Sequence, residues 1–309
     1  KETLVLRPES DVEAWGQAEF IAAEEMNRDR GFWWSPDGAS LLVQHTDESP
    51  VPVWHIADPA PPDRAPRQQR YPAAGTTNAV VSLWHVDLAS GMQTRIERDS
   101  QAFEYLARVT WTDGFAPVLQ VLSRDQQRSQ VLEVSVDSGT TAVLRTIEDP
   151  HWVELASAPT RNPEGQLVTM EDHEDRRRIF VDGEPISSTQ WQVRSIIECF
   201  ADSVLATASD EPTDVHVVRF GHDGSTDVLT AGQGVHSAVV GGSSTVIVRA
   251  TLESVSPEYR VHLDDGTVLD VQSTATPAPF LPEVSLMKLG ERELSAAVLF
   301  PRGHQPGST

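Results

Sequence analysis

The sequence predicts an all-β fold, and three patterns support this prediction. Short runs of β-branched and aromatic residues recur along most of the 309-residue chain, and turn-forming residues separate them. Five of these runs precede a turn glycine, and the five glycines lie 48, 44, 41 and 42 residues apart. A second series of runs falls between them. A period of this length is typical of one four-stranded blade, so the chain is predicted to form several blades of a β-propeller.

The first series consists of hairpins in which a strand precedes the turn glycine. Each glycine occupies a place where a tight turn needs a positive φ angle, and Asp-Gly and Ser-Gly pairs are common in such turns. Five hairpins in phase argue against two unrelated domains. The strands are 83–87, 131–135, 178–181, 215–220 and 259–263, followed by Gly91, Gly139, Gly183, Gly224 and Gly266.

The second series consists of an inner turn followed by a β-rich run. Alternation of the two series gives a meander of antiparallel strands, as the geometry of a blade requires. A β-sandwich is the competing architecture. The inner turns are 35–38, 112–114, 162–165, 202–203 and 241–242, and the runs after them are 41–43, 118–122, 167–168, 204–206 and 246–248.

Two segments interrupt the repeat. Residues 15–30 are rich in Ala, Glu and Met, which predicts a short helix in a β context. Residues 47–78 form an insertion in a blade and contain the proline-rich stretch 58–62, so we expect an ordered surface loop of limited flexibility.

Composition narrows the classes of partner. The chain has 46 Asp and Glu against 24 Lys and Arg, a formal net charge of -22, which repels nucleic acid. No apolar run reaches the roughly 18 residues of a membrane span.

Cys199 is the single cysteine, so no internal disulfide can form, and the sequence has no Asn-x-Ser/Thr acceptor. These features favour a reducing compartment, and we expect a cytoplasmic location.

Several motifs bear a resemblance to one family. Residues 18–26, which include Glu24 and Glu25, and the Gly-Phe-Trp-Trp-Ser-Pro-Asp-Gly run at 31–38 resemble the Glu-Glu helix and the following turn of dipeptidyl peptidase IV-type serine peptidases, in the prolyl oligopeptidase clan. The seven residues between Glu25 and Trp33 are more similar to the cytosolic branch. The next landmarks of the family, at 47–52 and 70–78, follow in order.

The resemblance implies an eight-bladed propeller that covers an α/β-hydrolase domain. It assigns Glu24 and Glu25 to the binding of the free N-terminal amine of a peptide substrate. It further implies release of Xaa-Pro or Xaa-Ala dipeptides, restriction of entry to short or unfolded peptides, and a possible homodimer.

Elementary chemistry is consistent with this role for the two glutamates. A peptide α-amine has a pKa of about 7.7–8.0 and is largely cationic at neutral pH, so two carboxylates can hold it by charge-assisted hydrogen bonds. An amine held at a fixed distance from the nucleophile places the cut after the second residue. Without the surrounding motif, the two adjacent glutamates would be interpreted as a solvated helix face.

The residues of the catalytic step are missing from the sequence. An α/β-hydrolase carries its nucleophile in Gly-x-Ser-x-Gly, and no such pentapeptide occurs here; the cluster 241–244 lacks the closing glycine. Residues 291–301 resemble the first strand leading into the catalytic domain. We therefore expect part of a longer enzyme, with propeller blades at 1–285, a linker and strand at 286–309, and no catalytic residue in this chain.

Other kinds of site are less well supported. The sequence contains no His-Glu-x-x-His, and the charged cluster 171–175 is interpreted as a solvated loop, so no metal and no cofactor are expected. Two alternatives to a peptidase domain stay open: a non-catalytic scaffold propeller, and a sugar-active propeller whose paired carboxylates would converge across a central channel. Six tryptophans are expected in the core between blades: Trp33, Trp34, Trp84, Trp111, Trp152 and Trp191.

Overall fold

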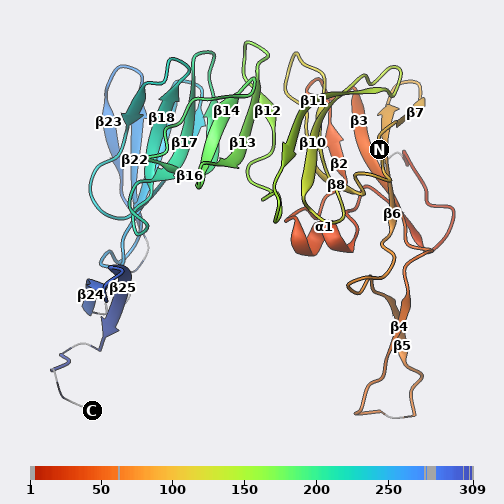
Figure 1. The fold of residues 1–309 in the computed structure, drawn as a ribbon, viewed down its shortest axis with the longest axis horizontal. Helices are drawn as coiled ribbons and strands as arrows, with labels where there is room; N and C mark the ends of the chain where they lie inside the picture. The colour runs from red at the N-terminus through yellow and green to blue at the C-terminus, as the bar shows by residue number, and fades with distance from the viewer. Residues whose placement is uncertain are drawn as a thin grey trace. The chain divides into compact units, whose positions relative to one another are not determined.

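The computed structural model describes residues 4–61, 63–274, 276, 283–301, 303–305 and 307. Within these residues the chain contains strands β1 to β25 and one helix, α1 (Phe20–Glu25) (Figure 1). The all-β prediction is therefore confirmed. The chain divides into two compact units, Lys1–Arg161 and Asn162–Thr309. No helix among the described residues is long and apolar enough to span a bilayer.

The first unit contains two large sheets. In one sheet the order is β1-β3-β6-β7, with β2 also paired to β3, and in the other it is β11-β10-β9-β8. The strands of the first sheet are β1 (Glu13–Trp15), β2 (Phe32–Trp34), β3 (Ser40–Asp47), β6 (Val80–Asp87) and β7 (Gln93–Ile96). Those of the second are β8 (Tyr105–Thr110), β9 (Val118–Leu122), β10 (Arg128–Val134) and β11 (Thr141–Glu148), and β12 (Thr160–Arg161) ends the unit.

The second unit continues the same architecture, with four-stranded sheets in the orders β16-β17-β18-β19 and β20-β21-β22-β23. Its strands are β13 (Leu167–His173), β14 (Arg176–Val181), β15 (Glu184–Pro185), β16 (Gln192–Cys199), β17 (Ser203–Ser209), β18 (His216–Gly221), β19 (Thr226–Val228), β20 (Val235–Gly241), β21 (Ser244–Ala250), β22 (Glu258–Leu263) and β23 (Val268–Val271). A two-stranded hairpin follows, β24 (Glu283–Leu289) and β25 (Leu294–Phe300). Residues 302, 306, 308 and 309 of the predicted linker lie outside the described residues.

Apolar packing explains why these runs become strands. Every residue of β9 and of β17 is buried, because these strands have neighbours on both sides and are covered on both faces. In the first unit, Leu42 and Leu83 from one sheet pack with Leu106 and Leu119 from the other. The two sheets therefore share one apolar core, as neighbouring blades do.

The turn glycines confirm the expected backbone geometry. Their φ angles are 74° at Gly91, 76° at Gly139, 87° at Gly183, 83° at Gly224 and 82° at Gly266. Gly139 is required for a second reason, because a Cβ atom there would lie 2.1 Å from the carbonyl oxygen of Arg95. The period found in the sequence thus reflects one repeated turn.

The structure corrects the two predicted interruptions. The helix covers only Phe20–Glu25 rather than 15–30, since Trp15 belongs to β1 and Gln17 forms a β-bridge with Arg30. The insertion is not only a loop. Its residues also form the hairpin of β4 (Val53–Ile56) and β5 (Arg67–Arg70), which extends from the first unit (Figure 1).

The expectation for the tryptophans is wrong at two positions. Trp34 is 53% exposed and Trp152 is 61% exposed, whereas Trp191 is buried. Trp33 and Trp111 pack against the apolar core of the first unit. Trp152 is exposed because it belongs to a turn after β11 and not to a strand.

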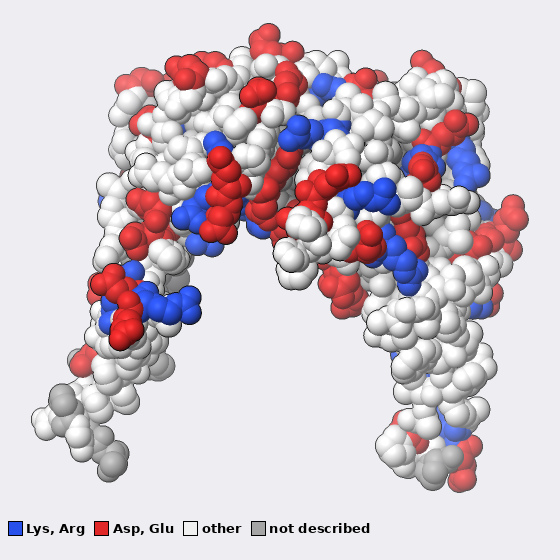
Figure 2. Space-filling view, in the orientation of Figure 1, with Lys and Arg blue, Asp and Glu red and all other residues white. Residues whose placement is uncertain are grey.

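The charged side chains on the surface reflect the excess of acidic over basic residues in the sequence. Acidic groups are spread over the visible face, with basic groups among them (Figure 2).

Cys199 is buried in β16, and burial raises the pKa of its thiol to about 12. The thiol is therefore protonated at neutral pH.

Candidate functional site

The two predicted glutamates lie on a closed loop between β1 and β2, which we call the Glu-Glu loop (residues 16–31). The amide of Gly16 donates to the carbonyl of Gln44 at 2.9 Å, and the amide of Gly31 donates to the carbonyl of Gly16 at 3.1 Å. A Cβ atom at position 31 would lie 2.6–2.8 Å from backbone atoms of Gln17. Only glycine fits this crossing, so the base of the loop is tightly defined.

Helix α1 occupies the tip of the Glu-Glu loop. The side chain of Glu19 caps its N-terminus, accepting a hydrogen bond from the amide of Ala22 at 2.7 Å. The amides of Met26 and Arg28 both donate to the carbonyl of Ala22, and Asn27 turns the chain with a φ angle of 50°. The helix therefore ends directly after Glu24 and Glu25.

One face of α1 packs against β8. Ala22 and Met26 are buried in an apolar cluster with Tyr105, Ala107 and Val153. Figure 1 shows the helix at the end of the sheet that contains β8 and β10. This packing directs Glu24 and Glu25 away from the cluster, and both side chains are exposed.

Glu25 lines a pocket of about 250 Å³ in the first unit. This volume is below the roughly 300–1,000 Å³ typical of pockets that bind drug-sized ligands. Glu25 and Glu154 supply negative charge, and Arg108 supplies positive charge. The other lining residues are Asn27, Gln126, Trp152, Val153 and Leu155.

The far wall of this pocket is a turn from another part of the chain. Asp149 accepts hydrogen bonds from the amides of His151 and Trp152, and the amide of Val153 donates to the carbonyl of Gln126 at 2.6 Å. The indole Nε1 of Trp152 donates to Glu154 at 3.3 Å. An exposed aromatic face and a carboxylate are thereby presented beside Glu25.

Arg108 joins the pocket to the helix. It follows a bulge at Ala107 in β8, and its Nη1 donates to the carbonyl of Met26 at 2.5 Å. Partial burial lowers the pKa of the guanidinium. A single side chain thus holds the carbonyl just beyond Glu25 and also lines the pocket.

Glu19 and Arg28 form a buried ion pair beneath the helix. Arg28 Nη2 lies 3.9 Å from Glu19 Oε1, and their side chains are 7% and 5% exposed. Burial raises the pKa of Glu19, opposed by the amide of Ala22 and the charge of Arg28. Burial also lowers the pKa of Arg28 to about 10.

The second sequence motif, residues 70–78, lies next to the first. The ring of Tyr71 contacts that of Phe20 at a centroid distance of 5.1 Å. Asn78 donates to Glu104 at 2.9 Å and to the hydroxyl of Tyr105 at 3.3 Å. Motifs about fifty residues apart in the sequence therefore meet around α1.

Sequence reasoning missed Glu19, Arg28, Arg108 and Trp152 as parts of this site. An acidic residue directly before a helix was a usable signal for Glu19. Arg108 and Trp152 lie 83 and 127 residues after Glu25. Only the packing of α1 on β8 brings them close, and no local pattern encodes it.

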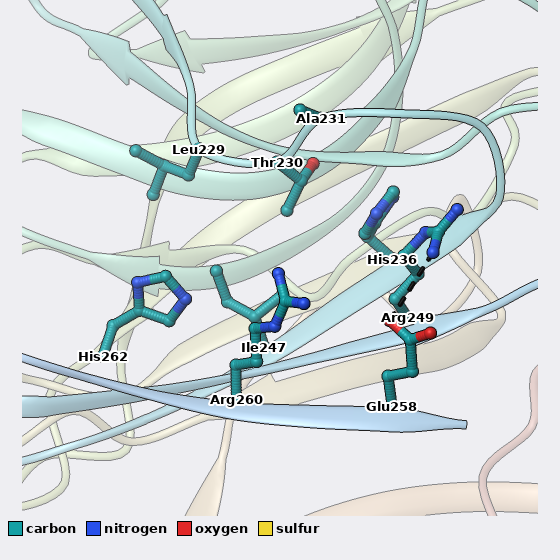
Figure 3. A pocket seen from close by; sticks show the side chains of 9 residues that line it. All are labelled: Leu229, Thr230, Ala231, His236, Ile247, Arg249, Glu258, Arg260 and His262. Carbon is teal, nitrogen blue, oxygen red and sulfur yellow. Dashed lines mark ion pairs between the residues drawn. The ribbon is translucent and has the colours of Figure 1, made fainter. Parts of the chain in front are cut away.

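A separate pocket of about 220 Å³ lies in the second unit, over one face of β20, β21 and β22 (Figure 3). Arg249 pairs with Glu258 at 3.5 Å, and Arg260 pairs with Asp270 at 3.1 Å. The buried ring of His236 stacks on that of His216. Since both arginines are paired with carboxylates, this pocket has no clear excess of either charge. No group of three or more metal-ligating side chains is found among the described residues.

Comparison with known proteins gives one consistent picture. The family model described as "Dipeptidyl peptidase IV (DPP IV) N-terminal region" matches residues 4–257. Dipeptidyl peptidase 8 of Mus musculus is 30% identical over 149 residues, which cover 41% of this chain and 17% of the relative. A probable dipeptidyl peptidase 4 of Aspergillus fumigatus is 28% identical over 208 residues, which cover 59% of this chain and 27% of the relative.

Solved structures show the same fold. The dipeptidyl peptidase 4 of Porphyromonas gingivalis superposes with a TM-score of 0.76 at 18% identity, over 94% of this chain and 44% of that one. A putative dipeptidyl aminopeptidase IV from Bacteroides ovatus superposes with a TM-score of 0.83 at 17% identity, over 99% of this chain and 49% of that one. The chain thus spans less than half of each of these proteins.

Proposed function

The chain belongs to the dipeptidyl peptidase IV N-terminal region family, and from this premise we propose that it is the substrate-gating domain of a serine dipeptidyl peptidase. In this proposal Glu24 and Glu25 bind the free N-terminal amine of the peptide. The catalytic triad is supplied by an α/β-hydrolase domain of the natural full-length protein.

The observation that carries the proposal is the placement of the two glutamates. They are the last two residues of a helix that is capped at its start and packed on β8, yet their carboxylates are exposed. Fixed backbone positions combined with exposed carboxylates suit a ligand-binding role, because little backbone freedom is lost when a cation binds.

The pocket beside Glu25 supports the same role. An N-terminal residue whose ammonium group pairs with the carboxylates can place its side chain against Trp152 and the stem of Arg108. The amine held there fixes the distance from the end of the peptide to the nucleophile, so the enzyme releases dipeptides, with proline or alanine as the second residue.

Several further assignments belong to this proposal. Residues 1–285 form the propeller blades, and residues 286–309 lead towards the hydrolase domain. We also propose a cytoplasmic location and an association of two copies.

The test uses the natural full-length protein with an H-Gly-Pro chromogenic reporter. A hydrogen bond to a charged group contributes about 1.5–3 kcal/mol, so Glu24→Gln and Glu25→Gln should each lower kcat/KM about 10- to 100-fold. Glu184→Gln, at an exposed position in β15, is the matched control. Unchanged kcat/KM in both glutamate variants would refute the amine site. A protein without the Gly-x-Ser-x-Gly motif would instead be a binding propeller.

A further inference from the structure

We infer that Glu19, Arg28 and Arg108 are positioning residues, which fix the Glu-Glu loop to β8 and so set where an amine can bind. The inference rests on the proposed function of Glu24 and Glu25. The sequence motif contains Glu19 but does not indicate that it acts together with Arg28 and Arg108.

Two arginines connect the loop and the strand in opposite directions. Arg28, from the loop, donates through Nη2 to the carbonyl of Leu106 in β8 at 2.9 Å. Arg108, from β8, donates through Nη1 to the carbonyl of Met26 in the loop at 2.5 Å. Because β8 is the end strand of its sheet, its outward carbonyls need partners from outside the sheet. The reciprocal bonds hold the loop against that edge at two points.

The bulge in β8 makes this exchange possible. Leu106 pairs with Val121 and Arg108 with Gln120, so Ala107 is an extra residue in the ladder. A bulge changes the direction in which the neighbouring side chains leave the strand. The carbonyl of Leu106 and the guanidinium of Arg108 can then both serve the Glu-Glu loop.

Glu19 couples the ion pair to the helix itself. One carboxylate caps α1 through the amide of Ala22 and also lies 3.9 Å from Arg28. The Arg28 guanidinium in addition lies 5.7 Å from the centre of the Trp33 ring. The start of the helix is therefore fixed by Glu19 and the residue after its end by Arg108, with Glu24 and Glu25 between these two anchors.

A purely stabilising role would be better filled by apolar side chains. Replacing a buried ion pair with apolar residues of similar volume is often neutral or stabilising. Arg28 also leaves its buried Nε without a hydrogen-bond partner, which costs free energy. Such a cost is understandable where the geometry of a site is being held, since a misplacement of about 1 Å can cost about 100-fold in rate.

A double-mutant cycle on the natural full-length protein tests this inference. Lysine keeps the charge at position 28 but cannot donate to the carbonyls of Arg30 and Leu106 in the same fork geometry. We expect Arg28→Lys to lower kcat/KM for the H-Gly-Pro reporter at least tenfold. In a background that already carries Glu24→Gln and Glu25→Gln, the same change should cost less than about twofold, because the residue acts through the glutamates.

Arg178→Lys is the matched control. Arg178 is also buried, donates to the carbonyl of Ser187 and pairs with a carboxylate, that of Glu174, but it lies in the second unit. Its replacement should cost the same factor in both backgrounds, and hydrogen exchange of residues 19–26 should accelerate only in Arg28→Lys.

The outcomes separate the two proposals. A loss from Arg28→Lys that is equal in both backgrounds would overturn the positioning role and leave the amine site intact. Full activity of the protein that carries both glutamate changes would refute the amine site, and the positioning role with it.

Discussion

The buried side chain of Glu19 interacts with two neighbouring residues. It accepts the amide of Ala22 and pairs with Arg28. Burial raises its pKa above the usual 4.5, although both partners act in the opposite direction. The Glu19 carboxylate therefore binds a proton more tightly in the folded protein than in the unfolded chain.

This shift predicts a pH dependence of stability. Between pH 4.5 and the raised pKa, the folded state binds more protons at Glu19 than the unfolded state, so the stability it contributes falls as pH rises through that window. The slope can reach about 1.4 kcal/mol per pH unit. Glu19→Gln should remove this slope. Urea unfolding of both proteins from pH 4 to 8 measures it, and parallel stability curves would contradict the assignment.

Individual residues differ in how well the sequence predicts them. Glu24 and Glu25 were predicted as amine-binding residues because two neighbouring runs, 18–26 and 31–38, resemble a family motif, and this role stays a prediction. Arg108 could not be predicted, because its role depends on a bulge in β8 and on a carbonyl 82 residues away. Trp152 was placed wrongly in the core, since sequence alone does not separate a strand tryptophan from one in a turn.

The Glu-Glu loop as an element depends on the glycines at its base. Its two legs pair through the bridge of Gln17 with Arg30 and the bond from Ala18 to Asp29. Composition predicted a helix across the whole segment, but these pairings confine it to six residues. Tertiary pairing thus overrode the helical propensity of the flanking residues.

Gly31→Ala should disrupt this base. The added methyl would lie 2.6–2.8 Å from backbone atoms of Gln17, which cannot move without breaking the bridge to Arg30. We expect a loss of about 1–3 kcal/mol in the free energy of unfolding, as for overpacked sites. Gly241→Ala is the control, since a Cβ atom there meets nothing within 4 Å. Equal unfolding midpoints for the two variants in urea would contradict the close packing.

The hairpin of β4 and β5 shows the limit of composition at the level of elements. Prolines in the stretch 58–62 predicted a loop, and the structure places strands on both sides of that stretch. The ring of Trp54 contacts that of Tyr71 at 5.1 Å. This contact gives the insertion an ordered base close to α1.

Across the chain as a whole, the repeat was predictable and the site only in part. Within most sheets consecutive strands are joined by short turns, so turn glycines and their spacing report the repeat locally. The pocket at Glu25 combines a loop, a strand and a turn from distant segments. The set of residues that line this pocket depends on how the sheets of the first unit pack, and local sequence patterns do not reveal that packing.

The net charge of -22 predicts a salt dependence of substrate capture. Acidic groups raise the local concentration of a cationic peptide, and salt screens this attraction over a Debye length of about 8 Å at 0.15 M. In the natural full-length protein, raising the salt concentration from about 0.05 to 0.5 M should lower kcat/KM for the H-Gly-Pro reporter several-fold. The value of kcat should stay within about twofold, because in the proposed function the bound substrate is already paired with Glu24 and Glu25. Steady-state kinetics at constant pH measures both constants, and a kcat/KM that does not change with salt would show that the acidic surface plays no part in capture.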